Sequence, residues 1–189
     1  MSKRSRPGAV RVLHLVRHGQ YESGELGSGK LTALGRTQAL RLARKFEALP
    51  VESIVSSDLV RAVETAQILA EQLGMTRPKR IRLLREVLPS KVPGFRVPID
   101  KRVKDALRVE RIVERFFKAS RRTKHQVIVC HGNLIRALLL RVTSGRLDGW
   151  YRLPTHHVGV TSFAISRSGI RVTAFDVIEH LPARMRTRE

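Results

Sequence analysis

Two spacings of apolar residues alternate along the chain, and they predict strands and helices in turn. Nearly continuous apolar runs at 10–16 and 127–130 are typical of strands buried on both faces of a parallel sheet. Shorter patterns predict strands at 53–56 and 81–84 and a hairpin of 158–165 with 170–177. Apolar residues at helical spacing predict helices over 34–49, 60–73, 109–120 and 134–142. This alternation predicts a three-layer α/β/α sandwich with a mostly parallel central sheet.

The same pattern suggests where elements begin and where order ends. Thr32 and Asp58 are suitable N-caps for the first two helices. The stretch 86–100 holds three prolines and a glycine, so we expect an irregular loop there. No repeat or linker divides the chain, which predicts one domain over 1–189 with loose basic ends at 1–8 and 182–189.

Composition narrows the classes of function. The 189 residues are 42% hydrophobic, which suits a globular protein, and no apolar run is long enough to cross a membrane. We therefore expect no membrane partner and, since no targeting segment is recognisable, a cytoplasmic location. A homo-oligomer stays open, because an edge strand can support one.

The net charge of +21 favours a phosphorylated substrate or another acidic partner. Ten Lys and Arg residues lie between 101 and 124, beside an apolar stripe that makes them the outer face of a packed helix. Aromatic residues are only 5% of the chain, so stacking platforms are scarce and nucleic acid is not expected as the main target.

Two histidines directly follow the two buried strands. Arg17-His18-Gly19 comes after the first strand and His131-Gly132-Asn133 after the second. Arg61 falls in the first turn of a helix, so it too is expected at the crevice where active sites of open α/β sheets collect.

Histidines and arginines together suit phosphoryl transfer. Arginine offers paired donors to the phosphate oxygens, and an imidazole nitrogen can attack phosphorus and carry the phosphoryl group. A second histidine can bind a phosphate oxygen, and a carboxylic acid can protonate the leaving group. The residues therefore predict a phosphate site that needs neither metal nor other cofactor.

The ordered motifs resemble the histidine phosphatase, or phosphoglycerate-mutase-like, superfamily over essentially the whole chain. Finer details are similar to the branch of its mitochondrial serine/threonine phosphatase. The motifs are Leu15-Val16-Arg17-His18-Gly19, Leu31–Arg36, Ser57–Ala66 and His131-Gly132-Asn133, and the branch details are Gln20-Tyr21, Leu84-Arg85-Glu86, Val129-Cys130-His131 and Trp150–Leu153.

The resemblance implies a role for each matching residue. It implies that His18 is the nucleophile, that Arg17, Arg61 and His131 bind phosphate, and that Glu86 is the proton donor. Gln20 and Asn133 are further candidates at the site, and Glu22, Glu25 and Asp58 stay open as alternative proton donors. The expected activity is hydrolysis of phosphoserine and phosphothreonine in proteins. Phosphohistidine proteins or small phosphometabolites are alternative substrates, and a nucleic-acid-binding or scaffold role is a distant one.

The single cysteine offers a competing mechanism. Cys130 and Arg136 have the spacing of a cysteine-dependent phosphatase loop, between a strand and a helix. That interpretation leaves Arg17, His18 and Arg61 without a function, so we expect a buried, inert thiol. With one cysteine, no intramolecular disulfide can form.

Overall fold

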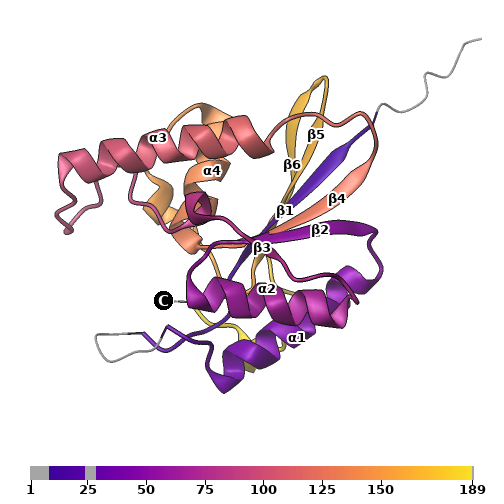
Figure 1. Cartoon of the computed structure of the whole chain (residues 1–189). Coiled ribbons are helices and arrows are strands. Elements are labelled where there is room, and N and C mark those ends of the chain that lie inside the picture. Colours follow the sequence, from indigo (N-terminus) through magenta and orange to yellow (C-terminus); the bar gives the residue numbers. More distant parts are fainter. Residues whose placement is uncertain (1–8, 24–28, 189) are drawn as a thin grey trace, which may run out of the picture.

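The computed structural model, which describes residues 9–23 and 29–188, has a six-stranded sheet with helices on both faces (Figure 1). The sheet order is β3-β2-β4-β1-β5-β6. Strands β3, β2, β4 and β1 run parallel, and β5 runs antiparallel to both of its neighbours, β1 and β6. The strands are β1 (Arg11–Arg17), β2 (Val51–Ser56), β3 (Lys79–Arg80), β4 (Lys124–Cys130), β5 (Val160–Ser166) and β6 (Gly169–Val177).

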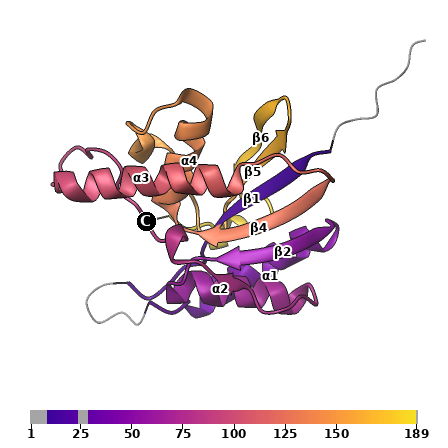
Figure 2. The same cartoon turned by 45° about the horizontal axis from the view of Figure 1, so that its top comes forward.

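The helices lie in two layers, one on each side of this sheet (Figure 2). Val16 and Val129 pack with α1 and α2, whereas Leu15 and Ile128 pack with α3 and α4. Successive side chains of a strand point to opposite faces, so each buried strand serves both layers. The three-layer prediction is confirmed. The helices are α1 (Ala33–Glu47), α2 (Val60–Gln72), α3 (Ile99–Phe116) and α4 (Gly132–Ser144).

The two predicted caps fared differently. Thr32 is the N-cap of α1, and its hydroxyl accepts a hydrogen bond of 3.0 Å from the Gly35 amide. The prediction for Asp58 is wrong, because Leu59 is the N-cap of α2 and no side chain caps that helix. Asp58 instead accepts two hydrogen bonds from Arg85, at 2.7 and 2.8 Å. The local pattern assigns the Asp58 carboxylate to helix capping, but in the fold this carboxylate binds the guanidinium of Arg85.

The segment between the second and third helices differs most from expectation. The predicted strand 81–84 is wrong, since a short 3-10 helix (Arg82–Leu84) occupies it. The predicted loop 86–100 ends earlier than expected, because α3 begins at Ile99. This start lies ten residues before Val109, where the helical pattern of apolar residues becomes visible. In those ten residues the inward position is held by a charged residue, Asp105, so hydrophobic periodicity cannot reveal the helix.

The end of the chain is also more ordered than predicted. A loose tail over 182–189 is wrong for the described part, 182–188, which includes a 3-10 helix (Ala183–Met185). The buried Gln38 amide donates to the Met185 carbonyl at 2.8 Å and to the Thr187 hydroxyl at 2.9 Å. These bonds satisfy a buried polar group, which is why the segment packs despite its basic composition. The other predicted loose end, residues 1–8, lies outside the described residues.

Two glycines allow the loop after β1 to lie against the start of α1. A Cβ on Gly19 would be 2.6 Å from the Gly35 carbonyl oxygen, and a Cβ on Gly35 would be 1.9 Å from the Gln20 carbonyl oxygen. No side chain fits at either distance, so this close approach requires glycine.

Within 9–23 and 29–188, no helix has the combined length and apolar character that a membrane crossing requires.

Candidate active site

The carboxyl ends of β1 and β4 bring the two histidine motifs together. The strands are parallel neighbours, with Arg17 opposite Cys130 in register. The His18 amide donates to the Cys130 carbonyl at 3.0 Å, and the ring centroids of His18 and His131 are 5.2 Å apart. The two histidine motifs therefore lie side by side at the carboxyl ends of these strands.

Hydrogen bonds at both ring nitrogens determine the tautomer of His18. Its Nδ1 lies 2.9 Å from the Gly19 carbonyl oxygen, which can only accept, so Nδ1 carries the proton. Its Nε2 then keeps a lone pair, and the Arg61 Nε–H donates to it at 3.0 Å. The first turn of α2 thus places the Arg61 guanidinium against the nitrogen of His18 that keeps the lone pair.

The surroundings of His18 keep its imidazole neutral. The side chain is buried, and burial lowers the pKa of His18 well below its usual value, with His131, Arg61 and Arg17 lowering it further. Tyr21 packs edge-on against the ring with a 5.1 Å centroid distance, and the Arg61 guanidinium lies 4.5 Å from the Tyr21 centroid. A neutral, oriented imidazole is the form that can act as a nucleophile.

His131 is held by a serine that the motif contained but to which no role was assigned. Its Nε2 lies 2.9 Å from the hydroxyl of Ser57, the first residue after β2. Its Nδ1 is buried and has no hydrogen-bond partner among the described residues. Burial and the charges of Arg61 and Arg17 lower the pKa of His131 to about 3. The position of Ser57 at a strand end was the available clue to its role.

Arg17 is buried and is oriented by a residue that sequence reasoning missed. Its Nη1 donates to the Thr155 carbonyl at 2.8 Å. A Cβ on Gly132 would be 3.4 Å from the Arg17 Nε and 2.9 Å from the Thr155 hydroxyl. Gly132 therefore leaves room for the guanidinium beneath the start of α4. No sequence pattern connects Thr155 with Arg17, which are 138 positions apart.

Glu86 lies at the amino end of α4, beside these residues. Its Oε1 accepts hydrogen bonds from the Leu134 amide at 3.0 Å and the Val87 amide at 3.2 Å. Burial raises the pKa of Glu86 above its ordinary value, against the lowering effect of those amides. A carboxyl whose pKa is raised retains its proton to higher pH, which is the property required of a general acid.

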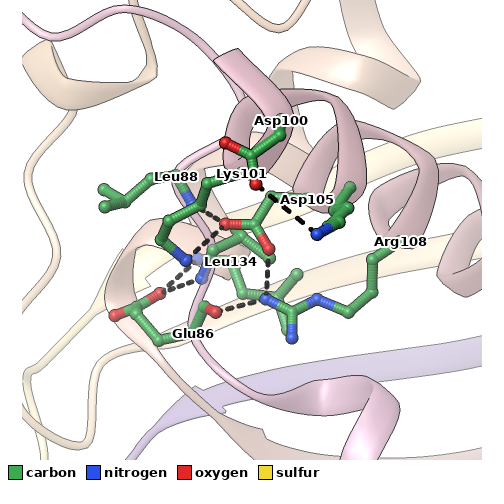
Figure 3. A network of polar contacts seen from close by, with 9 residues as sticks. Glu86, Leu88, Asp100, Lys101, Asp105, Arg108 and Leu134 are labelled. Carbon is green, nitrogen blue, oxygen red and sulfur yellow. Dashed lines mark hydrogen bonds and ion pairs between the residues drawn. The ribbon is translucent and has the colours of Figure 1, made fainter. Parts of the chain in front are cut away.

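A network from α3 holds the segment that carries Glu86 (Figure 3). The buried Asp105 accepts from the Leu88 amide at 2.8 Å and forms ion pairs with Arg108 at 2.8 Å and Lys101 at 3.1 Å. Arg108 in turn donates to the Glu86 carbonyl oxygen. These contacts connect the backbone on both sides of Val87 to α3. Asp105 links them, because it binds both the Leu88 amide and Arg108.

Replacing Asp105 with asparagine should loosen this segment. Loss of a buried, paired charge leaves Arg108 without its carboxylate, so we expect a loss of about 2–3 kcal/mol in the free energy of unfolding. Turnover of a substrate with a poor leaving group should fall more than turnover of an activated aryl phosphate. Asp100→Asn is the matched control, because the Asp100 pair with Lys104 is exposed and 3.5 Å long. Equal losses in the two variants would disprove a special role for Asp105.

The remaining candidates have other partners or lie outside the described residues. Gln20 accepts from the Thr32 hydroxyl at 2.9 Å and Asn133 accepts from Arg136 at 3.0 Å, so both side chains hold structure next to the site. Glu22 is exposed, and Glu25 lies outside the described residues. Cys130 is fully buried, and burial raises the pKa of its thiol, which disfavours a thiolate nucleophile. Among the described residues, no three His, Cys, Asp or Glu side chains are grouped as ligands for a metal ion.

Acid should unfold the protein through its buried histidines. Burial, as the largest cause, lowers the pKa to about 4 for His14 and His180 and to about 3 for His131. The unfolded chain takes up these protons below about pH 6.5, so stability falls as pH falls, by at most about 1.4 kcal/mol per pH unit for each histidine. Urea unfolding between pH 7 and 5 measures this slope. His180→Gln should reduce it, and an unchanged slope would contradict the assignment.

Comparison with known proteins places these features in a family. A model of the histidine phosphatase superfamily (branch 1) matches residues 13–108 and 99–177. The mitochondrial serine/threonine-protein phosphatase Pgam5 of Drosophila mojavensis is 30% identical over 174 residues, which cover 85% of this chain and 60% of that protein. The chain thus spans about three fifths of the length of this relative.

Solved structures agree with the fold. A mycobacterial glucosyl-3-phosphoglycerate phosphatase is 25% identical with a TM-score of 0.67, and the alignment covers 89% of this chain and 99% of that one. YhfR of Bacillus stearothermophilus has a TM-score of 0.71 at 23% identity, over 90% of this chain and 98% of that one, which shows the shared fold alone.

The comparisons overturn one expectation. The cytoplasmic location is contradicted, since the Drosophila relatives are named as mitochondrial phosphatases. The expectation rested on the lack of a recognisable targeting segment, and such a lack does not specify a compartment.

Proposed function

Because the chain belongs to the histidine phosphatase superfamily, we propose that it hydrolyses phosphate monoesters in two steps through a phosphohistidine on His18. The observation that carries the proposal is the fixed tautomer of His18, whose Nδ1 is bonded to the Gly19 carbonyl and whose Nε2 lone pair faces Arg61. A nitrogen held in this way needs no base to activate it, in contrast to a serine hydroxyl.

In the first step, the His18 Nε2 attacks phosphorus as the bond to the leaving oxygen breaks. Arg61 now donates to the attacking nitrogen, so phosphate binding must shift its guanidinium to the non-bridging oxygens. Arg17 supplies a second fixed positive charge, and the His131 Nδ1 is available to an oxygen because Ser57 holds the other nitrogen. These groups stabilise the charge of the transferring phosphoryl group.

Glu86 completes both steps. It gives its proton to the departing alkoxide, and the carboxylate that remains accepts a proton from the water that attacks phosphohistidine. This second attack releases inorganic phosphate and restores the neutral His18 and the protonated Glu86. The raised pKa of Glu86 supports this role, because the acid must be protonated when the substrate binds.

We propose proteins carrying phosphoserine or phosphothreonine as the substrates, a choice supported by the name of the Drosophila relative. The structural relative that acts on glucosyl-3-phosphoglycerate keeps small phosphate esters as the second candidate class. Phosphohistidine in proteins is the third. Catalysis on any of them requires only side chains of this chain.

The test is turnover in excess EDTA of an aryl phosphate, a phosphoserine peptide, a phosphohistidine peptide and a small sugar phosphate. A radiolabelled substrate quenched into alkali should leave label on the protein that is stable to base and lost in acid, as expected for a phosphoramidate. Activity that disappears with EDTA, or label that survives acid, would refute the two-step histidine route. The ratio of kcat/KM values among the substrates decides the class.

A further inference from the structure

The turn of residues 156–159, which leads into β5, lies against the backbone of the proposed nucleophile. The Val158 amide donates to the carbonyl oxygens of Arg17 at 3.1 Å and of His18 at 3.3 Å. In return, the Arg17 amide donates to the Gly159 carbonyl at 3.2 Å. The position of this turn therefore helps to set the position of the His18 backbone.

A ring contact joins the same turn to His18. The side chain of His157 is buried, and its ring centroid lies 5.7 Å from that of His18. A hydrogen bond of 3.0 Å from the Gly159 amide to the His156 carbonyl closes the turn. A shift of the 156–159 turn would therefore change both the backbone contacts and the ring surroundings of His18.

The 156–159 turn is strained at its third residue. Val158 has a φ of +52°, in the left-handed region that β-branched residues rarely adopt. Its side chain is fully buried and packs in the core that α1 and α2 form with the sheet. Such a backbone conformation costs free energy and persists only where surrounding contacts fix it. Contacts from other parts of the fold must therefore hold this turn.

Asp176 supplies such contacts. Its Oδ1 accepts from the His156 amide at 2.8 Å, and its Oδ2 lies 2.6 Å from Nδ1 of His156. A carboxylate can only accept, so this Nδ1 carries the proton. The Asp176 side chain is only 7% exposed, so water competes little for these bonds. A Cβ on Gly159 would collide with Oδ1 of Asp176, so glycine leaves the space that the carboxylate occupies.

An irregularity between β5 and β6 directs Asp176 toward the turn. The pairing of the two strands shifts register between Val160 and Ser162, opposite the part of β6 that contains Asp176. At this bulge Asp176 has a φ of +48°, and its amide donates to the Thr161 hydroxyl at 3.2 Å. Bulges redirect side chains and are frequent beside active sites. The bulge in β6 thus places a buried carboxylate behind the 156–159 turn.

We propose that Asp176 is a positioning residue, which acts through His156 to hold the strained turn and so to fix His18 for attack on phosphorus. This role rests on the proposed function, in which His18 is the nucleophile. A small displacement of a nucleophile slows its attack strongly. Phosphate binding should change less, because the guanidinium of Arg17 is held separately by the Thr155 carbonyl and Arg61 lies on α2.

The test replaces Asp176 with asparagine, which tolerates a left-handed φ and can still accept from the His156 amide but has no second acceptor for Nδ1. In single turnover with saturating nitrophenyl phosphate, the rate of His18 phosphorylation should fall about tenfold. The affinity for inorganic phosphate as a competitive inhibitor should change by less than about threefold. Asp148→Asn, the matched control, should change neither value, because Asp148 is exposed and binds Arg146.

Removing the partner side chain tests the same bond without altering the bulge. His156→Ala eliminates the ring that donates to Asp176 and keeps the backbone amide that binds Oδ1. We expect it to lower the phosphorylation rate by a similar factor, about tenfold, again with little change in phosphate affinity.

Glycine at position 158 tests the role of strain. Because glycine adopts a φ of +52° without a steric penalty, the turn should then depend less on Asp176. In the Val158→Gly protein, Asp176→Asn should lower the rate by less than about threefold. An unchanged rate in Asp176→Asn and His156→Ala, a loss of phosphate affinity as large as the loss of rate, or equal losses in the two backgrounds would overturn the inference. Failure of the unaltered protein to form phosphohistidine would instead refute the proposed function.

Discussion

Replacing His18 with alanine should lower kcat/KM for an aryl phosphate by at least about 1,000-fold, because it removes the nitrogen that we propose attacks phosphorus. The alkali-stable label on the protein should vanish with it. The side chain is buried, so the variant's fold is checked by its urea unfolding curve. Steady-state kinetics in EDTA measure the loss.

Cys130→Ser is the matched control for this experiment. The thiol is fully buried, with its pKa raised by burial, so it contributes no thiolate near neutral pH. We expect kcat/KM within about threefold of wild type, because serine is close to cysteine in size. The small change that we allow for reflects the position of residue 130 next to His131. Activity that survives His18→Ala but is lost in Cys130→Ser would replace the histidine mechanism with the cysteine one.

Replacing Glu86 with glutamine should have the second largest effect, and its size should depend on the leaving group. Glutamine keeps the shape and can still accept from the Leu134 amide, but it has no proton to give. Turnover of a phosphoserine peptide, whose alkoxide leaves poorly, should fall by about 100- to 10,000-fold. Nitrophenyl phosphate, whose leaving group needs no proton, should lose less than about tenfold in its first step.

The pH dependence gives the same prediction a second readout. Because burial raises the pKa of Glu86, the required acid form is lost as pH rises through that raised pKa, and the rate should fall there. The low-pH limb should lie well below the usual histidine range, because the pKa of His18 is lowered. In Glu86→Gln the high-pH limb for the peptide should disappear.

Glu22→Gln is the control for the identity of the acid. Glu22 is exposed, and its backbone pairs with Lys30 in the loop after β1. We expect nearly wild-type rates and an unchanged pH profile for this variant. A leaving-group dependence that follows Glu22 rather than Glu86 would reassign the proton donor.

Most of the elements that position the site residues could be predicted from local sequence patterns. Apolar runs and helical spacings predicted the layers, because burial imposes the same periodicity wherever these elements occur. Histidine and arginine at strand ends predicted the crevice, because parallel strands finish at one edge of the sheet. Thr32 could be predicted as an N-cap because the capping hydrogen bond joins residues only three positions apart.

The errors share a physical origin in long-range polar contacts. Asp58 pairs with Arg85 instead of capping α2, and Asp105 is buried in α3 where the pattern requires an apolar residue. The tail packs because Gln38 needs partners that lie nearly 150 positions away in the chain. A buried charge or amide is stable only beside its partner, and the spacing of residues does not disclose which partner the fold will supply.

The sequence by itself therefore determined the layered architecture and the residue types at the crevice, because both depend on burial and on strand direction. Only the tertiary structure decided the tautomer of His18, the raised pKa of Glu86 and the support from Ser57 and Thr155. Those properties come from atoms within hydrogen-bond distance and from exclusion of water, and segments far apart in the sequence create both only when the chain folds.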